Sequence, residues 1–180
     1  MKDILEIAKN IKLVVFDVDG VMTDGSLTFD ENGVEYKTYN AKDGQGIQLL
    51  HKAGITPAII TKRKNGTVSY RANVLGIKEF HEGVSNKLEE LKKILKERKI
   101  SFEEVAYMGD DIPDVCVLEK VGLACCPCDA VCEVKSISNF IATKGGGKGA
   151  VRELTDMILK AKGFDLTKLI FEPVDPSCRT

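Results

Sequence analysis

The chain has 180 residues, a usual size for one domain, and 43% of them are hydrophobic, enough to build a core. With 26 basic and 27 acidic side chains its net charge is −1, which gives no field of one sign to favour nucleic acid or a membrane surface. No apolar run approaches the roughly 20 residues that span a bilayer, and the first ten residues carry acids, unlike a secretory signal. We therefore expect one domain over residues 1–180, in the cytoplasm, without nucleic-acid or membrane partners and with six reduced cysteines.

Short apolar runs alternate with amphipathic segments along the chain. The runs are typical of buried parallel strands and fall at 11–16, 57–61, 105–108, 121–126 and, more weakly, 139–143. Helical patterns occupy 43–54, 65–76, 85–99 and 149–162. Gly54 and Gly76 are expected to end the first two helices, and Ser85 or Asn86 to cap the third. The alternation predicts an α/β, Rossmann-like fold with a mainly parallel sheet and helices on both faces.

Two segments depart from the alternation. Residues 25–39 show apolar residues with a period of two around Asn32-Gly33, which predicts a β-hairpin just after the first strand. The tail, about 164–180, contains Pro173 and Pro176 and is expected to be irregular.

Two carboxylates follow the first predicted strand. Asp17 and Asp19 would point the same way if the strand continued, at the edge of the sheet where open α/β folds bind ligands. Like charges this close are costly unless a cation or a proton offsets them. Taken alone, Asp-x-Asp-Gly is equally well interpreted as an ordinary turn after a strand.

Further polar residues fall at the ends of other predicted elements. Thr61 ends the second strand, where its hydroxyl can donate to a phosphate oxygen. Lys87 lies near the start of a helix, where the ammonium and the helix N–H groups both favour an anion. Asp110 and Asp111 follow the third strand, with Asp114 shortly after. Each alone is most simply a cap or a solvated side chain, but all of them in this order indicate a functional site.

In four motifs the sequence resembles the haloacid dehalogenase superfamily of phosphatases. The motifs are Asp17-Val18-Asp19-Gly20-Val21, Thr61, Lys87 and Gly109-Asp110-Asp111-Ile112-Pro113-Asp114. Three segments, DVDGVMTDG (17–25), DGQGI (43–47) and GGGKGAVRE (145–153), are similar to the 3-deoxy-D-manno-octulosonate 8-phosphate phosphatases. Nonulosonate 9-phosphate phosphatases share most of these features. The resemblance covers roughly residues 10–155 and departs at Lys62, where the family usually has glycine.

The resemblance implies a Mg²⁺-dependent phosphatase that acts through an aspartyl-phosphate, with a phosphorylated sugar acid of lipopolysaccharide biosynthesis as substrate. By this resemblance Asp17 is the nucleophile, and Asp19 is the general acid and later the general base. Mg²⁺ would bind the Asp17 carboxylate, the Asp19 backbone carbonyl and the Asp110 carboxylate.

The resemblance also assigns the groups around the phosphate. Thr61 and Lys87 would hold the oxygens that are not transferred. Asp111 and Asp114 are expected to orient Lys87 or metal-bound waters. Outside the phosphate site, Arg63 is a candidate for the carboxylate of the sugar acid, and Lys62 either adds a substrate contact or alters which substrate fits.

Many members of this superfamily close the site with an inserted cap domain, but here no stretch is free for one. Residues 18–60 already hold the hairpin and a helix, and residues 62–86 hold a helix and a short strand. A neighbouring subunit is then expected to supply the missing walls. We expect a homotetramer, as in the family resembled, with the hairpin at a subunit interface near the site. The tail is a further candidate to reach a neighbouring site.

Other interpretations stay open. In one, the substrate is another small phosphomonoester. In the other, the chain is a catalytically silent scaffold, and the presence of Asp17, Asp19, Lys87 and Asp110 argues against this second interpretation. Mg²⁺-dependent release of phosphate from an aryl phosphate separates an enzyme from a scaffold. Four clustered cysteines lack the paired spacing of a zinc site and are interpreted as small buried residues of a strand and the following turn: Cys125, Cys126, Cys128 and Cys132.

Overall fold

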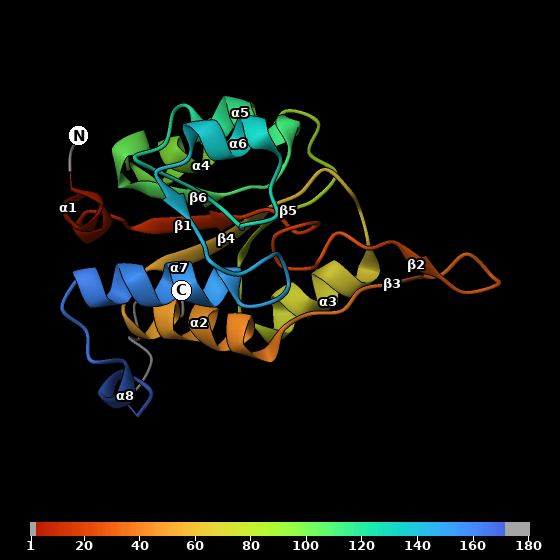
Figure 1. Ribbon diagram of the computed structural model, residues 1–180, viewed down its shortest axis with the longest axis horizontal. Helices are drawn as coiled ribbons and strands as arrows, with labels where there is room; N and C mark the ends of the chain where they lie inside the picture. Colours follow the sequence, from red (N-terminus) through yellow and green to blue (C-terminus); the bar gives the residue numbers. More distant parts are fainter. Residues whose placement is uncertain (1–2, 172–180) are drawn as a thin grey trace.

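A sheet of six parallel strands organises the computed structural model, which describes residues 3–171 (Figure 1). The strand order is β5-β4-β1-β6-β7-β8. The strands are β1 (Leu13–Phe16), β4 (Thr56–Ile60), β5 (Glu79–His81), β6 (Val105–Met108), β7 (Leu123–Cys126) and β8 (Phe140–Ile141). Strand β1 pairs with β4 on one side and with β6 on the other. The strand order reverses there, and the carboxyl ends of strands at such a point border the ligand-binding crevice of open α/β sheets.

Helices cover both faces of the sheet, as the sequence predicts (Figure 1). One layer contains α1 (Ile4–Lys9), α2 (Ala41–Lys52), α3 (Gly66–Val74), α7 (Ala150–Ala161) and α8 (Leu166–Leu169). The other contains α4 (Lys87–Arg98), α5 (Ile112–Leu118) and α6 (Cys132–Ile137). Because side chains alternate along a strand, Val14 and Phe16 pack into the first layer while Leu13 and Val15 pack into the second. This burial on both faces is why β1 is a continuous apolar run.

The strands and the four longer helices lie where the sequence predicts them. Residues at the ends of the helices explain where two of them stop and where one begins. Gly54 and Gly76 follow α2 and α3 with φ of 72° and 71°, a backbone conformation that glycine adopts without strain. Asn86 rather than Ser85 caps α4, since its side chain accepts a hydrogen bond from Glu89 N at 3.1 Å. The short helices α1, α5, α6 and α8 were not predicted, because one or two turns give little periodicity to detect.

The prediction of an irregular tail is wrong for its first part. Asp165 caps α8, and Leu169 is buried against the core formed by α2 and α7. One buried leucine therefore fixes a helical turn that composition alone does not reveal. Residues 172–180, including the predicted approach of the tail to a neighbouring site, lie outside the described residues.

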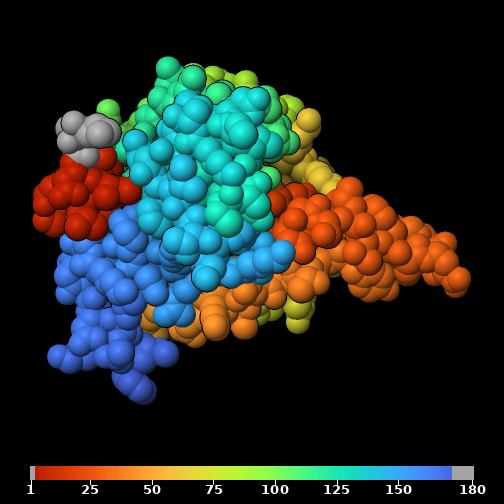
Figure 2. All heavy atoms as spheres, viewed as in Figure 1, coloured from red at the N-terminus to blue at the C-terminus, as the bar shows by residue number. Residues whose placement is uncertain are grey.

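The predicted hairpin is present and projects from the body of the molecule (Figures 1 and 2). Its strands β2 (Thr28–Phe29) and β3 (Glu35–Tyr36) are antiparallel. Asp30 N donates to Val34 O at 3.1 Å, so three residues form the loop, and Gly33 takes the left-handed position at φ +78°. Four apolar side chains of the hairpin are each more than half exposed: Leu27, Phe29, Val34 and Tyr36.

The cysteine prediction is correct for one pair and wrong for the other. Cys125 and Cys126 are buried in β7, whereas Cys128 and Cys132 are exposed, the latter in α6. All the cysteines of the described part are free thiols.

Between β1 and α4 the described chain forms only the hairpin, α2, β4, α3 and β5, so the expectation of no inserted cap domain is confirmed. In residues 3–171, every helix is too short or too polar to cross a membrane.

Candidate active site

The carboxyl ends of β1, β4 and β6 bring the predicted residues to one cavity. Asp17 directly follows β1, and its backbone N donates to Met108 O of β6 at 3.0 Å, which keeps it in the ladder. Thr61 follows β4 and is buried, and Asp110 lies beyond the end of β6. The cavity has a volume of about 370 Å³ and is lined by Asp17, Asp19, Gly20, Gly25, Thr61, Lys62, Arg63, Lys87, Asp110, Asp111, Pro113 and Asp114. All nine residues that the sequence singled out therefore line one space.

Asp19 reaches the cavity through a turn, because the strand ends at Phe16. The turn depends on Gly20, whose φ is +81°. A Cβ at this position would lie 2.0 Å from Asp110 Oδ2, so glycine is required by close approach as well as by conformation. Asp19 is the more open of the two carboxylates, with 24% of its side chain exposed against 12% for Asp17.

The close approach at Gly20 gives a testable prediction. Gly20→Ala should lower kcat/KM by roughly 100-fold, because the Asp110 carboxylate must move. Gly54→Ala is the matched control, since Gly54 shares the positive φ but an added Cβ there would meet no atom within 4 Å. Both variants should lose about 1 kcal/mol of unfolding free energy in urea titrations. Equal activity of the two variants would argue against a role for the close approach.

Lys87, which the sequence places near the start of a helix over 85–99, is the first residue of α4, and its side chain is only 4% exposed. Its Nζ lies 3.0 Å from Asp17 Oδ2 and 2.7 Å from Asp114 Oδ1. Burial by itself lowers the pKa of Lys87, but the two carboxylates outweigh it and raise the pKa, so the ammonium stays charged. A cation and a helix N-terminus thus meet next to Asp17, an arrangement that favours a bound anion.

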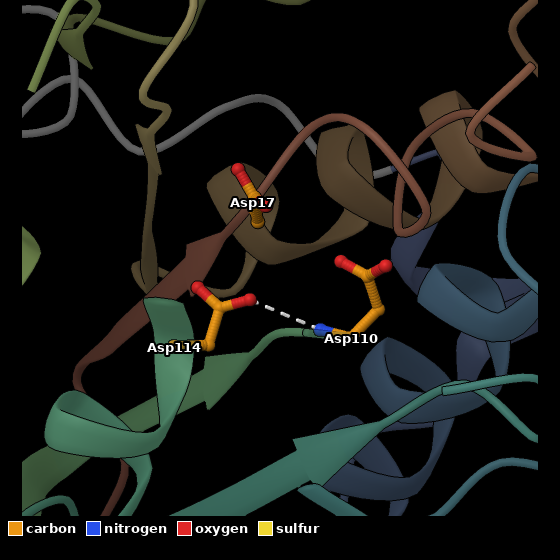
Figure 3. A group of neighbouring side chains, drawn as sticks. All are labelled: Asp17, Asp110 and Asp114. Carbon is orange, nitrogen blue, oxygen red and sulfur yellow. Dashed lines mark hydrogen bonds between the residues drawn. The ribbon is translucent and has the colours of Figure 1, made fainter. Parts of the chain in front are cut away.

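Asp114 holds this arrangement in place. Its carboxylate is 1% exposed and accepts hydrogen bonds from Lys87, from Tyr107 Oη at 2.6 Å, and from the backbone N of Asp110 at 3.1 Å. The bond to Asp110 is drawn in Figure 3. Asp114 therefore holds the Lys87 ammonium in place. Asp111 instead caps α5, where its carboxylate accepts from Ile112 N at 2.8 Å.

The site fits a divalent cation bound through oxygen. One carboxylate oxygen from each of Asp17, Asp110 and Asp114 lies within 4.8 Å of the other two, and Figure 3 shows the three side chains as neighbours. Burial raises the pKa of Asp17 to about 6, and burial together with the charges of Asp17 and Asp114 raises that of Asp110 to about 8. Asp110 Oδ1 is buried without a hydrogen-bond partner. A hard cation such as Mg²⁺ would offset these costs.

The three carboxylates differ in how free they are to bind that cation. Both oxygens of Asp114 already accept hydrogen bonds, so Asp17 and Asp110 are the side chains available to hold it. Ligation by the Asp19 backbone carbonyl stays a prediction.

At the mouth of the cavity, the two basic residues after Thr61 behave differently. Lys62 is exposed at the rim. Arg63 is tied to the hairpin, with its Nη2 2.7 Å from Glu35 Oε2 and its Nη1 3.9 Å from Asp19 Oδ2. Much of the Arg63 charge is thus already matched by protein carboxylates, which weakens its candidacy for the carboxylate of a sugar acid.

The structure adds supporting residues that sequence reasoning did not assign. Asp43 is buried in α2 and accepts from Arg152 N at 2.8 Å and Gly149 N at 3.3 Å, which fixes the start of α7. A Cβ on Gly146 would lie 2.0 Å from Gly20 O, so the glycine-rich turn 145–149 packs directly on the turn that carries Asp19. The sequence analysis used both segments for the family resemblance but gave neither of them a role in supporting the site.

Comparison with known proteins defines first the class and then the family. A model of haloacid dehalogenase-like hydrolases matches residues 79–154. The 3-deoxy-D-manno-octulosonate 8-phosphate phosphatase KdsC of Escherichia coli K12 is 42% identical over 161 residues, 89% of this chain and 86% of KdsC. The chain therefore belongs to the haloacid dehalogenase superfamily and, within it, to the 3-deoxy-D-manno-octulosonate 8-phosphate phosphatase family.

Solved structures agree. The 3-deoxy-D-manno-octulosonate 8-phosphate phosphatase of Moraxella catarrhalis, in complex with a magnesium ion, a phosphate ion and a KDO molecule, superposes with a TM-score of 0.90 at 38% identity. The match covers 94% of this chain and 97% of that one. A cobalt-bound deoxy-D-mannose-octulosonate 8-phosphate phosphatase of Haemophilus influenzae gives a TM-score of 0.87 at 36% identity, covering 92% and 99%.

Proposed function

We propose that this protein is a Mg²⁺-dependent phosphatase that hydrolyses 3-deoxy-D-manno-octulosonate 8-phosphate in the cytoplasm. The observation that carries the proposal is Asp17 itself, a buried carboxylate at the end of β1 with an ammonium 3.0 Å away and the orphaned Asp110 oxygen in the same cluster. The names of the relatives supply the substrate, a phosphorylated sugar acid.

In the proposed reaction, a carboxylate oxygen of Asp17 attacks phosphorus and forms an aspartyl-phosphate as the bond from phosphorus to the sugar oxygen breaks. Protonated Asp19 gives its proton to that oxygen, so the sugar acid leaves with a hydroxyl group rather than an alkoxide. Asp19, now a carboxylate, then takes a proton from the water that attacks the aspartyl-phosphate, releasing inorganic phosphate and restoring Asp17.

The other groups of the cavity favour the transition state. Lys87 and the N-terminus of α4 offset charge on the oxygens that are not transferred, and Thr61 donates to one of them. Bound Mg²⁺, held by Asp17 and Asp110, supplies positive charge that keeps these carboxylates ionised and balances the phosphoryl group.

A substrate panel tests the proposal. Phosphate release is measured as kcat/KM for the octulosonate 8-phosphate, a nonulosonate 9-phosphate, several other phosphorylated metabolites and a generic aryl phosphate. We expect the octulosonate 8-phosphate to give the highest value. Preference for another metabolite would remove the substrate assignment but keep the phosphatase. No Mg²⁺-dependent release from any member, the aryl phosphate included, would leave the scaffold interpretation.

Lys62, in place of the usual glycine, gives a prediction about selectivity. If its ammonium reaches the substrate from the rim, Lys62→Gly should lower kcat/KM for a sugar-acid phosphate by about 10-fold and change the value for an aryl phosphate little. The exposed position makes a loss of stability unexpected, so the melting temperature serves as the control. Equal effects on both substrates would mean that Lys62 points into solvent.

We further propose a homotetramer in which the hairpin lies at a subunit interface. The cavity is open at its mouth in a chain without a cap domain, while the hairpin carries four exposed apolar side chains and projects beyond the body (Figure 2). Exposed apolar surface of this kind marks protein contacts. A neighbouring copy is the simplest source of walls for a large polar substrate.

Light scattering at assay concentration checks this proposal. The wild type should have the mass of four chains. Phe29→Lys, which places a charge in the apolar patch, should reduce the mass and lower kcat/KM for the sugar-acid phosphate by at least about 10-fold. Lys92→Glu, a charge change on the solvent face of α4, is the control for surface charge. A fully active monomer would refute the shared site.

A further inference from the structure

A buried lysine lies beside the proposed general acid. Lys37 follows β3, and only 1% of its side chain is exposed. Its Nζ contacts Asp19 Oδ1 and lies 2.9 Å from Glu35 Oε1. Burying an ammonium costs free energy unless its partners are held in good geometry. The contact therefore requires defined positions of Asp19 and Glu35.

Glu35 joins this lysine to the loop after β4. Its Oε2 accepts from Arg63 Nη2 at 2.7 Å and from Asn65 Nδ2 at 2.9 Å, while Asn65 also caps α3. Glu35 and Lys37 are two residues apart on an extended arm and face the body, whereas Tyr36 between them is 56% exposed. Ion pairs and hydrogen bonds therefore attach the base of the hairpin to the body of the molecule next to Asp19.

Asp19 depends on outside groups for its orientation. It lies in a turn rather than in a strand, and a quarter of its side chain is open to the cavity. Two cations approach it in the described structure: Lys37 contacts Oδ1, and Arg63 is 3.9 Å from Oδ2. A general acid has to stay within hydrogen-bond reach of the oxygen that it protonates.

We propose that Lys37 is a positioning residue that holds Asp19 Oδ1 and so presents Oδ2 to the leaving oxygen. The inference rests on the proposed function and adds a residue to it. In the step concerned, the bond from phosphorus to the leaving oxygen breaks as the Asp19 proton moves to that oxygen, and Asp19 becomes a carboxylate. Lys37 neither gains nor loses a proton; it fixes the place of the carboxyl group.

The test uses leaving groups of similar size and different need for a proton. The oxygen of benzyl phosphate leaves as an alkoxide unless it is protonated, whereas 4-nitrophenyl phosphate releases 4-nitrophenolate, which leaves readily without a proton. For Lys37→Met we expect the ratio of kcat/KM for benzyl to that for 4-nitrophenyl phosphate to fall by roughly 10- to 100-fold. The kcat/KM value reports only steps up to loss of the leaving group, so slower hydrolysis of the aspartyl-phosphate does not enter. The ratio is also independent of the fraction of folded enzyme.

Companion variants keep the test decisive. Lys37→Arg, which retains the cation, should recover most of the loss. Glu35→Gln removes the charge that pairs with Lys37 and Arg63 but keeps every group that contacts Asp19. It should lower the ratio by several-fold, and it tests the inference if Lys37→Met does not fold. Lys92→Met breaks an exposed lysine–glutamate pair on α4 and should leave the ratio unchanged. If both Lys37→Met and Glu35→Gln keep the wild-type ratio, the inference is wrong and the proposed function stands. If the wild-type protein hydrolyses neither ester, the proposed function is wrong and the inference falls with it.

Discussion

Asp17→Asn is expected to lower turnover by on the order of 10⁴-fold or more, because an amide cannot form the aspartyl-phosphate. The loss should appear with every substrate, including 4-nitrophenyl phosphate, since the nucleophile serves them all. Phosphate release under steady-state conditions measures it. Asp156→Asn makes the same substitution in the Arg152 pair on the surface of α7 and should keep wild-type activity. Near-normal kcat in Asp17→Asn would eliminate the covalent mechanism.

The same variant separates a catalytic effect from a structural one. Because burial raises the pKa of Asp17 to about 6, the folded state prefers the protonated form, and stability falls as the pH rises from the ordinary carboxyl range through 6. At pH 7.5 the ionised side chain thus costs stability when no metal is bound, and asparagine removes that cost. We expect the metal-free variant to melt no lower than the metal-free wild type, since Lys87 keeps its contact with Asp114.

Removal of the metal is expected to have an effect of similar size. Excess chelator should abolish activity and added Mg²⁺ restore it, because the clustered carboxylates and the transferring phosphoryl group need a cation. Asp110→Asn should raise the Mg²⁺ concentration for half-maximal activity by about 100-fold and reduce the rise in melting temperature that Mg²⁺ produces in the wild type. Full activity in excess chelator would exclude the proposed role of the ion.

The neighbouring residue provides the matched control. Asp111→Asn keeps a good N-cap for α5, since asparagine and aspartate cap helices about equally well. Its Mg²⁺ requirement should therefore stay within about threefold of wild type. A large change in Asp111→Asn would mean that this carboxylate also serves the ion.

The sequence by itself determined the frame of the protein and the principal residues of its site. Short continuous apolar runs favour strands buried on both faces, and Gly54 and Gly76 end α2 and α3 at positive φ, so these elements could be predicted from local pattern. Carboxyl ends of parallel strands meet at one edge of a sheet, so the strand pattern alone was enough to bring Asp17, Thr61 and Asp110 together. The family resemblance added the chemistry.

Tertiary structure alone decided how these residues are held. Leu169 shows that one buried side chain can fix a helix of a single turn, for which the sequence has no periodic signal. Cys128 and Cys132 are exposed because the chain leaves β7 for the surface, and cysteine spacing does not record that turn.

The same holds for the ionic contacts around the site. Asp114 accepts from Lys87, from Tyr107 and from the loop after β6, and Lys37, 18 residues further along the chain, reaches Asp19 from the hairpin. These contacts join segments whose separation in the sequence follows no fixed spacing. They form only when packing excludes water from charged groups, because a buried charge costs free energy unless it is paired. No local sequence pattern records that burial.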